Sequence, residues 1–153
     1  MMTPRTSKTI LITDAGCATG EAIARHLASQ GHQLMLGARR LDRVAGLARE
    51  ITRAGGAANY QELDVTSHGS ARAFLLIAEA CHGRIDALVN TAGMAHGIVA
   101  LLPLLEAQGV AHVIHVPADH ALHGHAVAEA IDRAIARPGR VDIDRTLSRT
   151  LQA

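Results

Sequence analysis

The stretch Thr9-Ile-Leu-Ile-Thr-Asp-Ala-Gly-Cys-Ala-Thr-Gly20 decides the fold, because it joins a short apolar run to a turn that contains glycine. Its first part, Thr9 to Thr13, is β-branched and apolar, as is typical of a strand buried on both faces of a parallel sheet. Beyond the turn, Glu21 to Gln30 places apolar residues at helical spacing and stops before Gly31. The stretch therefore predicts a strand, a tight turn and a helix in succession.

The same alternation continues along the rest of the chain. Right-handed crossovers between such units give a parallel sheet with helices on both faces, so we predict an α/β fold with a doubly wound sheet in the order 3-2-1-4-5. We expect further strands at Gln33 to Gly37, Asn59 to Val65, Ile85 to Asn90 and Val110 to Val116, and helices at Leu41 to Ala54, Ala71 to His82 and Ala126 to Arg137.

The two ends of the chain carry weaker signals. Residues 1–8 are polar and are expected to form an N-terminal tail, which leaves residues 9–153 as a single domain. Val141 to Arg149 alternates apolar and polar residues and could add a sixth strand beside the fifth. With 153 residues, the chain suits one core and has no room for a separate substrate domain.

Composition and charge narrow the classes of partner. The chain has 15 Lys and Arg against 14 Asp and Glu, and aromatic residues make up 1% of it. Without a basic field or stacking rings, nucleic acid is not an expected partner. Cys17 and Cys81 lack the spacing of a disulfide scaffold or zinc module, and Ile10 to Ile12 is too short for a signal peptide or a membrane span. We therefore expect a cytoplasmic protein without a membrane partner.

The turn Thr13 to Gly20 is the first candidate site, because it lies between a strand and a helix. In that position, backbone N–H groups and the helix dipole can receive a pyrophosphate. The alternative is a turn that maintains the fold and binds nothing. Both interpretations stay open at this point.

Four segments in this order resemble the short-chain dehydrogenase/reductase family: the turn Thr13 to Gly20, the pair Arg39-Arg40, Leu63-Asp-Val-Thr66 and Asn90-Thr-Ala-Gly93. The resemblance implies a Rossmann-like NAD(P)-binding domain, and the basic pair is similar to that of NADP-preferring members, which makes NADP(H) the expected cofactor. The implied cofactor-binding residues are Thr13, Gly16, Gly20, Arg39, Arg40, Asp64, Val65, Asn90, Ala92 and Gly93.

The chain departs from the family pattern in its turn and in its chemistry. Asp14 and Ala18 replace the first two glycines of the family turn, and we expect the added charge and methyl group to weaken cofactor binding. No tyrosine or lysine follows residue 93, so the family's Tyr-x-x-x-Lys segment is missing, and Val116-Pro-Ala118 stands where the catalytic serine is expected. The standard proton donor of a reductase is therefore absent from this part of the sequence.

A histidine-rich segment could supply another acid. Asp119, His120, His123 and His125 follow the fifth strand, at the ligand-binding end of the sheet, and histidine titrates near neutral pH. An exposed polar loop is the alternative interpretation. The spacing of the three histidines lacks the His-Glu-x-x-His arrangement, so no metal site is predicted.

Three functions are compatible with these observations. The first is an NADP(H)-binding protein that has lost standard reductase chemistry. The second is an NADP(H)-dependent oxidoreductase that acts on a small carbonyl or alcohol substrate with a non-standard acid, and the third is a structural subunit that binds no nucleotide. The family's dimer helices look incomplete here, so we expect a homo-oligomer, or association with a homologue, that buries Gly97 to Leu105 and the side of the fifth strand.

Overall fold

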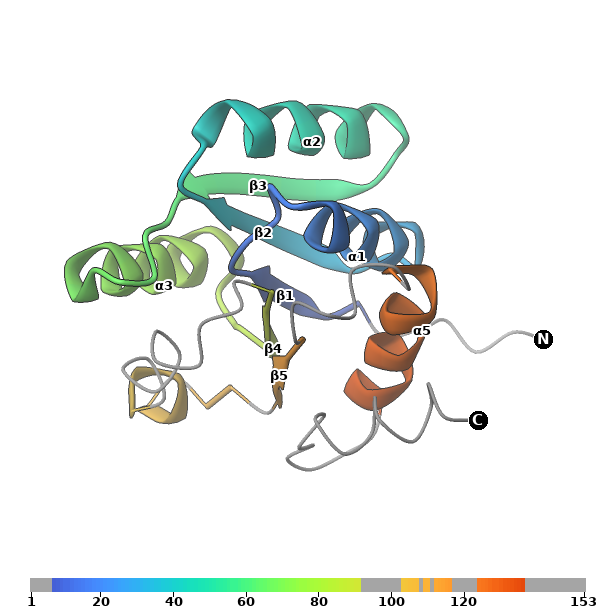
Figure 1. Ribbon diagram of the computed structural model, residues 1–153. Helices are drawn as coiled ribbons and strands as arrows, with labels where there is room; N and C mark the ends of the chain where they lie inside the picture. Colours follow the sequence, from blue (N-terminus) through green and yellow to red (C-terminus); the bar gives the residue numbers. More distant parts are fainter. Residues whose placement is uncertain (1–6, 92–102, 108, 111, 117–123, 137–153) are drawn as a thin grey trace.

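Five parallel strands form one sheet in the computed structural model, which describes residues 7–91, 103–107, 109–110, 112–116 and 124–136. The strands are β1 (Thr9–Ile12), β2 (Gln33–Ala38), β3 (Ala57–Glu62), β4 (Ala87–Asn90) and β5 (His112–His115). Their order is β3-β2-β1-β4-β5, and every neighbouring pair is parallel (Figure 1). The predicted fold class and strand order are confirmed.

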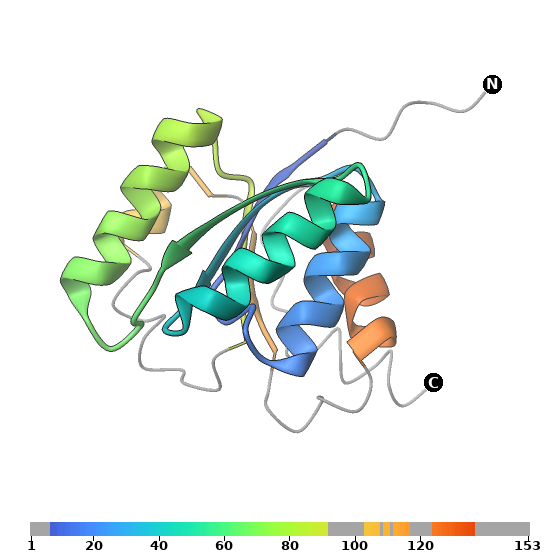
Figure 2. The same cartoon turned by 90° about the horizontal axis from the view of Figure 1, so that it is seen from above.

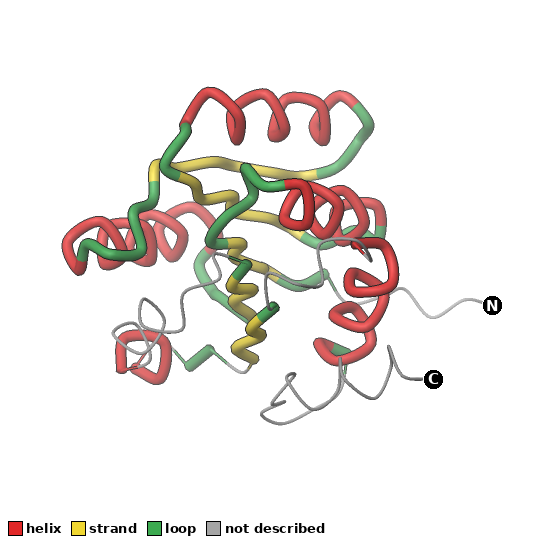
Figure 3. The backbone as a smooth tube through the Cα atoms, in the orientation of Figure 1, coloured by secondary structure: helices red, strands yellow, loops and turns green. Residues whose placement is uncertain are grey.

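Helices cover both faces of this sheet, as Figures 2 and 3 show. One face carries α1 (Ala18–Ser29), α2 (Leu41–Arg53) and α5 (Gly124–Ile135). The other carries α3 (His68–His82) and the short helix at residues 103–107. No described helix combines the length and the apolar character that crossing a membrane requires.

The alternation of side chains along each strand divides the core between the two faces. Ile10 and Ile12 of β1 pack with the α1, α2 and α5 side chains, whereas Leu11 between them packs with Phe74 of α3. All four of these side chains are buried. The near-continuous apolar sequence of β1 follows from this burial on both faces.

Capping residues account for helices that begin earlier than predicted. α1 begins at Ala18 instead of Glu21, because the Sγ atom of Cys17 accepts a hydrogen bond from the Gly20 N–H (3.3 Å) and caps the helix. α3 begins at His68 instead of Ala71, because the Ser67 hydroxyl accepts a hydrogen bond from the Ser70 N–H (3.2 Å).

The third strand was predicted too far along the chain. β3 ends at Glu62, opposite Ala38, where β2 also ends. Asp64 and Val65 therefore lie beyond the strand, at the carboxyl edge of the sheet. The predicted strand at Val141 to Arg149 lies outside the described residues.

Polar contacts join the chain at the opposite, amino edge of the sheet. The Lys8 N–H donates to Nδ1 of the buried His32 (3.1 Å), and the Thr9 N–H donates to the buried carboxylate of Asp86 (2.8 Å). Arg84 pairs with the same carboxylate (2.5 Å). The amino ends of β1, β2 and β4 are thus fixed by side chains as well as by the strand ladder.

Candidate functional site

The turn that follows β1 lies at the carboxyl edge of the sheet and is bound to the strands on both sides. The Thr13 hydroxyl donates to Oδ1 of the buried Asn90 (2.8 Å), and the Thr91 hydroxyl donates to the Asp14 carbonyl (2.7 Å). On the β2 side, the Ala15 N–H donates to the Gly37 carbonyl (3.0 Å). Thr13 and Asn90 of the predicted site therefore support the turn from within the sheet.

The first turn of α1 presents backbone N–H groups beside this edge. The Gly20 N–H is bonded to Cys17 Sγ and the Glu21 N–H to the Cys17 carbonyl (2.9 Å). The N–H groups of Ala18 and Thr19 have no hydrogen-bond partner in the described part of the chain. Two amides at a helix N-terminus are suited to an anionic group such as a phosphate.

Asp14 places a carboxyl group inside the same turn. Its side chain is half-buried and accepts a hydrogen bond from the Gly16 N–H. Desolvation by burial raises the pKa of this carboxyl above its ordinary value, and the hydrogen bond from Gly16 offsets part of that rise. The carboxylate thus accepts a hydrogen bond from the Gly16 N–H, which could otherwise face a ligand. It also adds negative charge where an anion would bind.

Packing alone requires the glycine at position 20. A Cβ atom there would lie 2.0 Å from the Asp14 carbonyl oxygen. Gly16 is less constrained, since its Cβ would meet the nearest atom, Cβ of Ala38, at 3.5 Å. Gly20 is therefore explained by the close approach of the helix to the turn, with or without a nucleotide.

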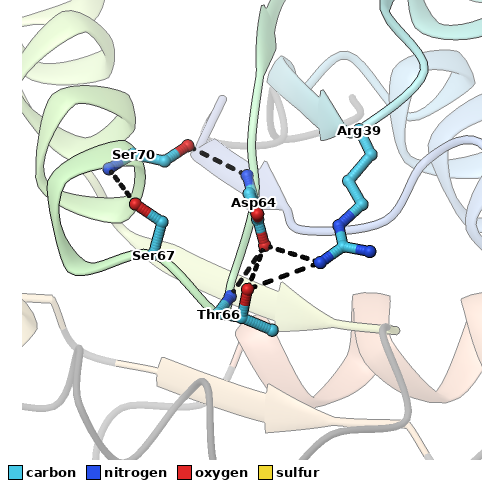
Figure 4. Close-up of polar contacts among 5 residues, drawn as sticks. All are labelled: Arg39, Asp64, Thr66, Ser67 and Ser70. Carbon is cyan, nitrogen blue, oxygen red and sulfur yellow. Dashed lines mark hydrogen bonds and ion pairs between the residues drawn. The ribbon is translucent and has the colours of Figure 1, made fainter.

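Arg39 lies at the end of β2 and is held by the segment that follows β3 (Figure 4). Its Nη2 atom donates to Oδ1 of Asp64 (3.0 Å) and approaches the Thr66 hydroxyl (3.4 Å). The Thr66 hydroxyl and N–H both donate to the same Asp64 oxygen, at 2.6 and 3.0 Å. The predicted site residues Arg39, after β2, and Asp64, after β3, are thus brought together.

The backbone around Asp64 is also fixed by α3. The Asp64 N–H donates to the Ser70 hydroxyl (2.9 Å), while the Ser67 N–H donates to the Asp64 carbonyl (3.0 Å). The hydrogen bonds from Thr66, followed by those from Arg39, lower the pKa of the Asp64 carboxyl. Asp64 is ionised at neutral pH and holds Arg39 in place. Val65 beside it is partly buried against the α3 core.

Two more arginines follow Arg39 at the start of α2. Arg40 is exposed and its Nη2 atom lies 3.8 Å from the Asp42 carboxylate. Arg43, in the first turn of α2, donates from Nη1 to the Gly16 carbonyl (3.2 Å). Arg43 is not among the site residues predicted from the sequence. Its position three residues after Arg40, near the start of a helix, was the signal that could have identified it.

Five predicted site residues lie outside the described residues: Ala92, Gly93, Asp119, His120 and His123. The backbone of His125 belongs to α5, so the prediction of a loop at this residue was wrong, and its side chain is not described. In the described part of the chain, no three His, Cys, Asp or Glu side chains are grouped as a metal ion would need.

The predicted oligomer surface is only partly described. Leu105 is buried in the core beneath α3 within a single chain, so this residue is covered without a partner. Residues 97–102 lie outside the described residues. Two hollows lined by described side chains lie between α1 and α2, around Ile51 and Gly55, and between α1 and α5.

The chain is similar in sequence to known proteins. A protein from Streptomyces virginiae, named for the ketoacyl reductase of monensin polyketide synthase, is 43% identical over 96 residues, which cover 63% of this chain and 37% of that protein. An uncharacterized oxidoreductase of Listeria innocua is 29% identical over 133 residues, covering 71% of this chain and 54% of its own. The chain thus spans about half or less of the length of these two relatives.

Among solved structures, a metagenomic short-chain oxidoreductase in complex with NADP has a TM-score of 0.66 and 25% identity, covering 88% of this chain and 80% of its own. The sequence model of the short chain dehydrogenase family matches residues 8–119, which include β1 to β5 and all three arginines described above. The chain belongs to the short chain dehydrogenase family.

Proposed function

We propose that this chain binds NADP(H) at the carboxyl edge of its sheet and lacks the standard proton donor of a reductase. The observation that carries the proposal is the juxtaposition of two groups. The unpartnered N–H groups of Ala18 and Thr19 lie at the start of α1, and the Arg43 guanidinium is bonded to the Gly16 carbonyl of the preceding turn. Arg39 and Arg40 directly follow the end of β2, at the same edge of the sheet. Amides at a helix N-terminus suit the pyrophosphate, and guanidinium groups suit a further phosphate.

The end of β2 favours NADP(H) over NAD(H). β2 ends at Ala38 and is followed by two arginines, so no carboxylate occupies the position from which an acidic side chain would bind the ribose 2′-hydroxyl. The structural relative solved with NADP supports the same choice at 25% identity.

The absence of standard chemistry rests on the sequence after residue 93. That region contains no tyrosine and no lysine, and Val116, which ends the described part of this segment, is followed by proline and alanine. A hydride transferred to a carbonyl carbon leaves an alkoxide that needs a proton. We therefore infer that this chain binds the cofactor without reducing carbonyl compounds at the rate of family members that carry the Tyr-x-x-x-Lys segment.

A fluorescence titration with NADPH and with NADH tests the proposed binding. We expect tighter binding of NADPH, and the Arg39→Ala, Arg40→Ala double variant should lose about 1–3 kcal/mol of that preference. Arg53→Ala, at the far end of α2, is the control and should leave both affinities unchanged. Equal affinities of the unmodified protein for the two nucleotides would reject the proposed preference, and binding of neither would favour the structural subunit.

The second test is turnover. NADPH oxidation would be followed with a panel of small aldehydes and ketones, beside a complete reductase of the same family. No oxidation above the rate without protein is the expected result. Sustained turnover would instead favour the oxidoreductase that uses a non-standard acid, and variants of Asp119, His120, His123 and His125 would then identify that acid.

A further inference from the structure

We propose that Arg43 is the residue that determines specificity for the adenosine 2′-phosphate, ahead of Arg39 and Arg40. This inference rests on the proposed binding of NADP(H) and names the side chain that would recognise its additional phosphate. It starts from the location of Arg43 on the first turn of α2, outside the segment immediately after β2.

Contacts of the turn after β1 bring Arg43 to the predicted site. The Ala15 N–H is bonded to the Gly37 carbonyl, and Gly16 faces Ala38, the last residue of β2. The Arg43 guanidinium then reaches the Gly16 carbonyl at 3.2 Å. Figure 2 shows the starts of α1 and α2 on the same side of the sheet. The guanidinium therefore lies beside the turn that would hold the pyrophosphate, at the point where this turn approaches the end of β2.

The partners of the three arginines differ in charge. Arg39 pairs with the Asp64 carboxylate at 3.0 Å, and Arg40 lies 3.8 Å from the Asp42 carboxylate. The partner of Arg43 is a neutral backbone carbonyl, and in the described part of the chain no carboxylate lies within ion-pair distance of it. Arg43 is thus the member of this group whose positive charge is not offset by an acidic side chain.

The hydrogen-bonding capacity of Arg43 leads to the same conclusion. A guanidinium has five N–H donors in a planar fork, and the Gly16 carbonyl accepts from one nitrogen, Nη1. The remaining donors can form a bidentate contact with a phosphate while the bond to Gly16 keeps the side chain oriented. Arg39 would have to share its guanidinium between a phosphate and Asp64.

The test uses adenosine 2′,5′-bisphosphate and AMP, which differ by the 2′-phosphate alone, in calorimetric titrations of the full chain. Arg43→Gln removes the charge, and Arg43→Lys retains it. Arg39→Gln and Arg40→Gln are matched variants at the two paired arginines. We expect Arg43→Gln to weaken binding of the bisphosphate roughly tenfold and binding of AMP less than about twofold. Arg43→Lys should keep most of the preference. Arg39→Gln and Arg40→Gln should each have a smaller effect than Arg43→Gln, and the loss expected of the Arg39→Ala, Arg40→Ala double variant requires both residues to be replaced.

Other outcomes separate the alternatives. A parallel loss of affinity for both ligands in Arg43→Gln would mean that Arg43 only supports the turn, which overturns this inference and leaves the proposed function intact. A larger effect of Arg39→Gln or Arg40→Gln would assign the phosphate to that residue instead. If the unmodified protein binds the two ligands equally, or binds neither, the proposed NADP(H) preference fails together with the role of Arg43.

Discussion

His32 and Asp132 are joined by a hydrogen bond of 3.0 Å although they lie 100 residues apart in the sequence. Because Nδ1 of His32 accepts from the Lys8 N–H, its Nε2 atom carries the proton and donates to the Asp132 carboxylate. Both side chains are largely buried. The contact attaches α5 to the start of β2 at the amino edge of the sheet.

Asp132→Ala should destabilise the protein, because it leaves a buried N–H of His32 without an acceptor. We expect a loss of about 1–3 kcal/mol in the free energy of unfolding, measured with urea. Asp42→Ala is the matched control: it removes an exposed carboxylate at 3.8 Å from Arg40 and should cost less than about 0.5 kcal/mol. Equal effects of the two substitutions would show that the bond to His32 contributes little.

Gly20→Ala and Gly46→Ala should change stability in opposite directions. The first substitution brings Cβ to 2.0 Å from the Asp14 carbonyl oxygen and should cost more than about 2 kcal/mol, because backbone must move. Nothing lies within 4 Å of a Cβ at Gly46, which is inside α2, and alanine there should stabilise by about 0.5–1 kcal/mol. Thermal unfolding of both variants measures the contrast, and a stable Gly20→Ala protein would disprove the close approach.

The raised pKa of Asp14 predicts a specific pH dependence of stability. A carboxyl that binds its proton more tightly in the folded protein favours folding at low pH, and this contribution is lost as the pH rises from the ordinary value of 3.8 through the folded pKa. Asp14→Asn keeps the acceptor for Gly16 and removes the titration. The unfolding temperature of the variant relative to the unmodified protein should therefore rise with pH across this range, and a constant difference would contradict the assignment.

Restoring glycine at both departures from the family turn should strengthen nucleotide binding. Asp14→Gly removes a carboxylate from the anion site and releases the Gly16 N–H, while Ala18→Gly removes an exposed methyl group from the helix start. We expect the double variant to bind NADPH more tightly, on the order of tenfold, by the same titration. Arg53→Ala, at the far end of α2, again serves as the comparison. Unchanged or weaker binding in the double variant would show that neither residue is an obstruction.

The sequence was sufficient to predict the fold, because β1 and β2 are apolar runs and each is followed by a helical repeat. Alternate side chains of β1 are buried on the two faces of the sheet, and a glycine follows each of the helices α1, α2 and α3. These features leave few other topologies. The predicted starts of α1 and α3 were wrong by three residues, and in both helices a side chain acts as the cap. The thiol of Cys17 and the hydroxyl of Ser67 are not distinguished from other polar residues until the helix forms.

The candidate site was only partly predictable. The pair Arg39-Arg40 is visible in the sequence, but its partners are not, since Asp64 is 25 residues away and is brought to Arg39 by the pairing of β2 with β3. Arg43 looks like an ordinary solvated helix residue until the turn is placed beside it. The bond between Thr91 and the Asp14 carbonyl depends equally on the pairing of β1 with β4.

The side-chain contacts at the amino edge of the sheet have a consequence for engineering. His32, Asp86 and their partners fasten the strands on the side away from the turn, so the parts that stabilise the scaffold and the parts that would select a ligand are separate in space. Libraries that randomise the three arginines and Asp14 can therefore be screened for new anionic ligands while the anchoring positions are kept constant. The residues at the carboxyl edge of this small domain can thus be varied without changing the contacts that hold its strands together at the amino edge.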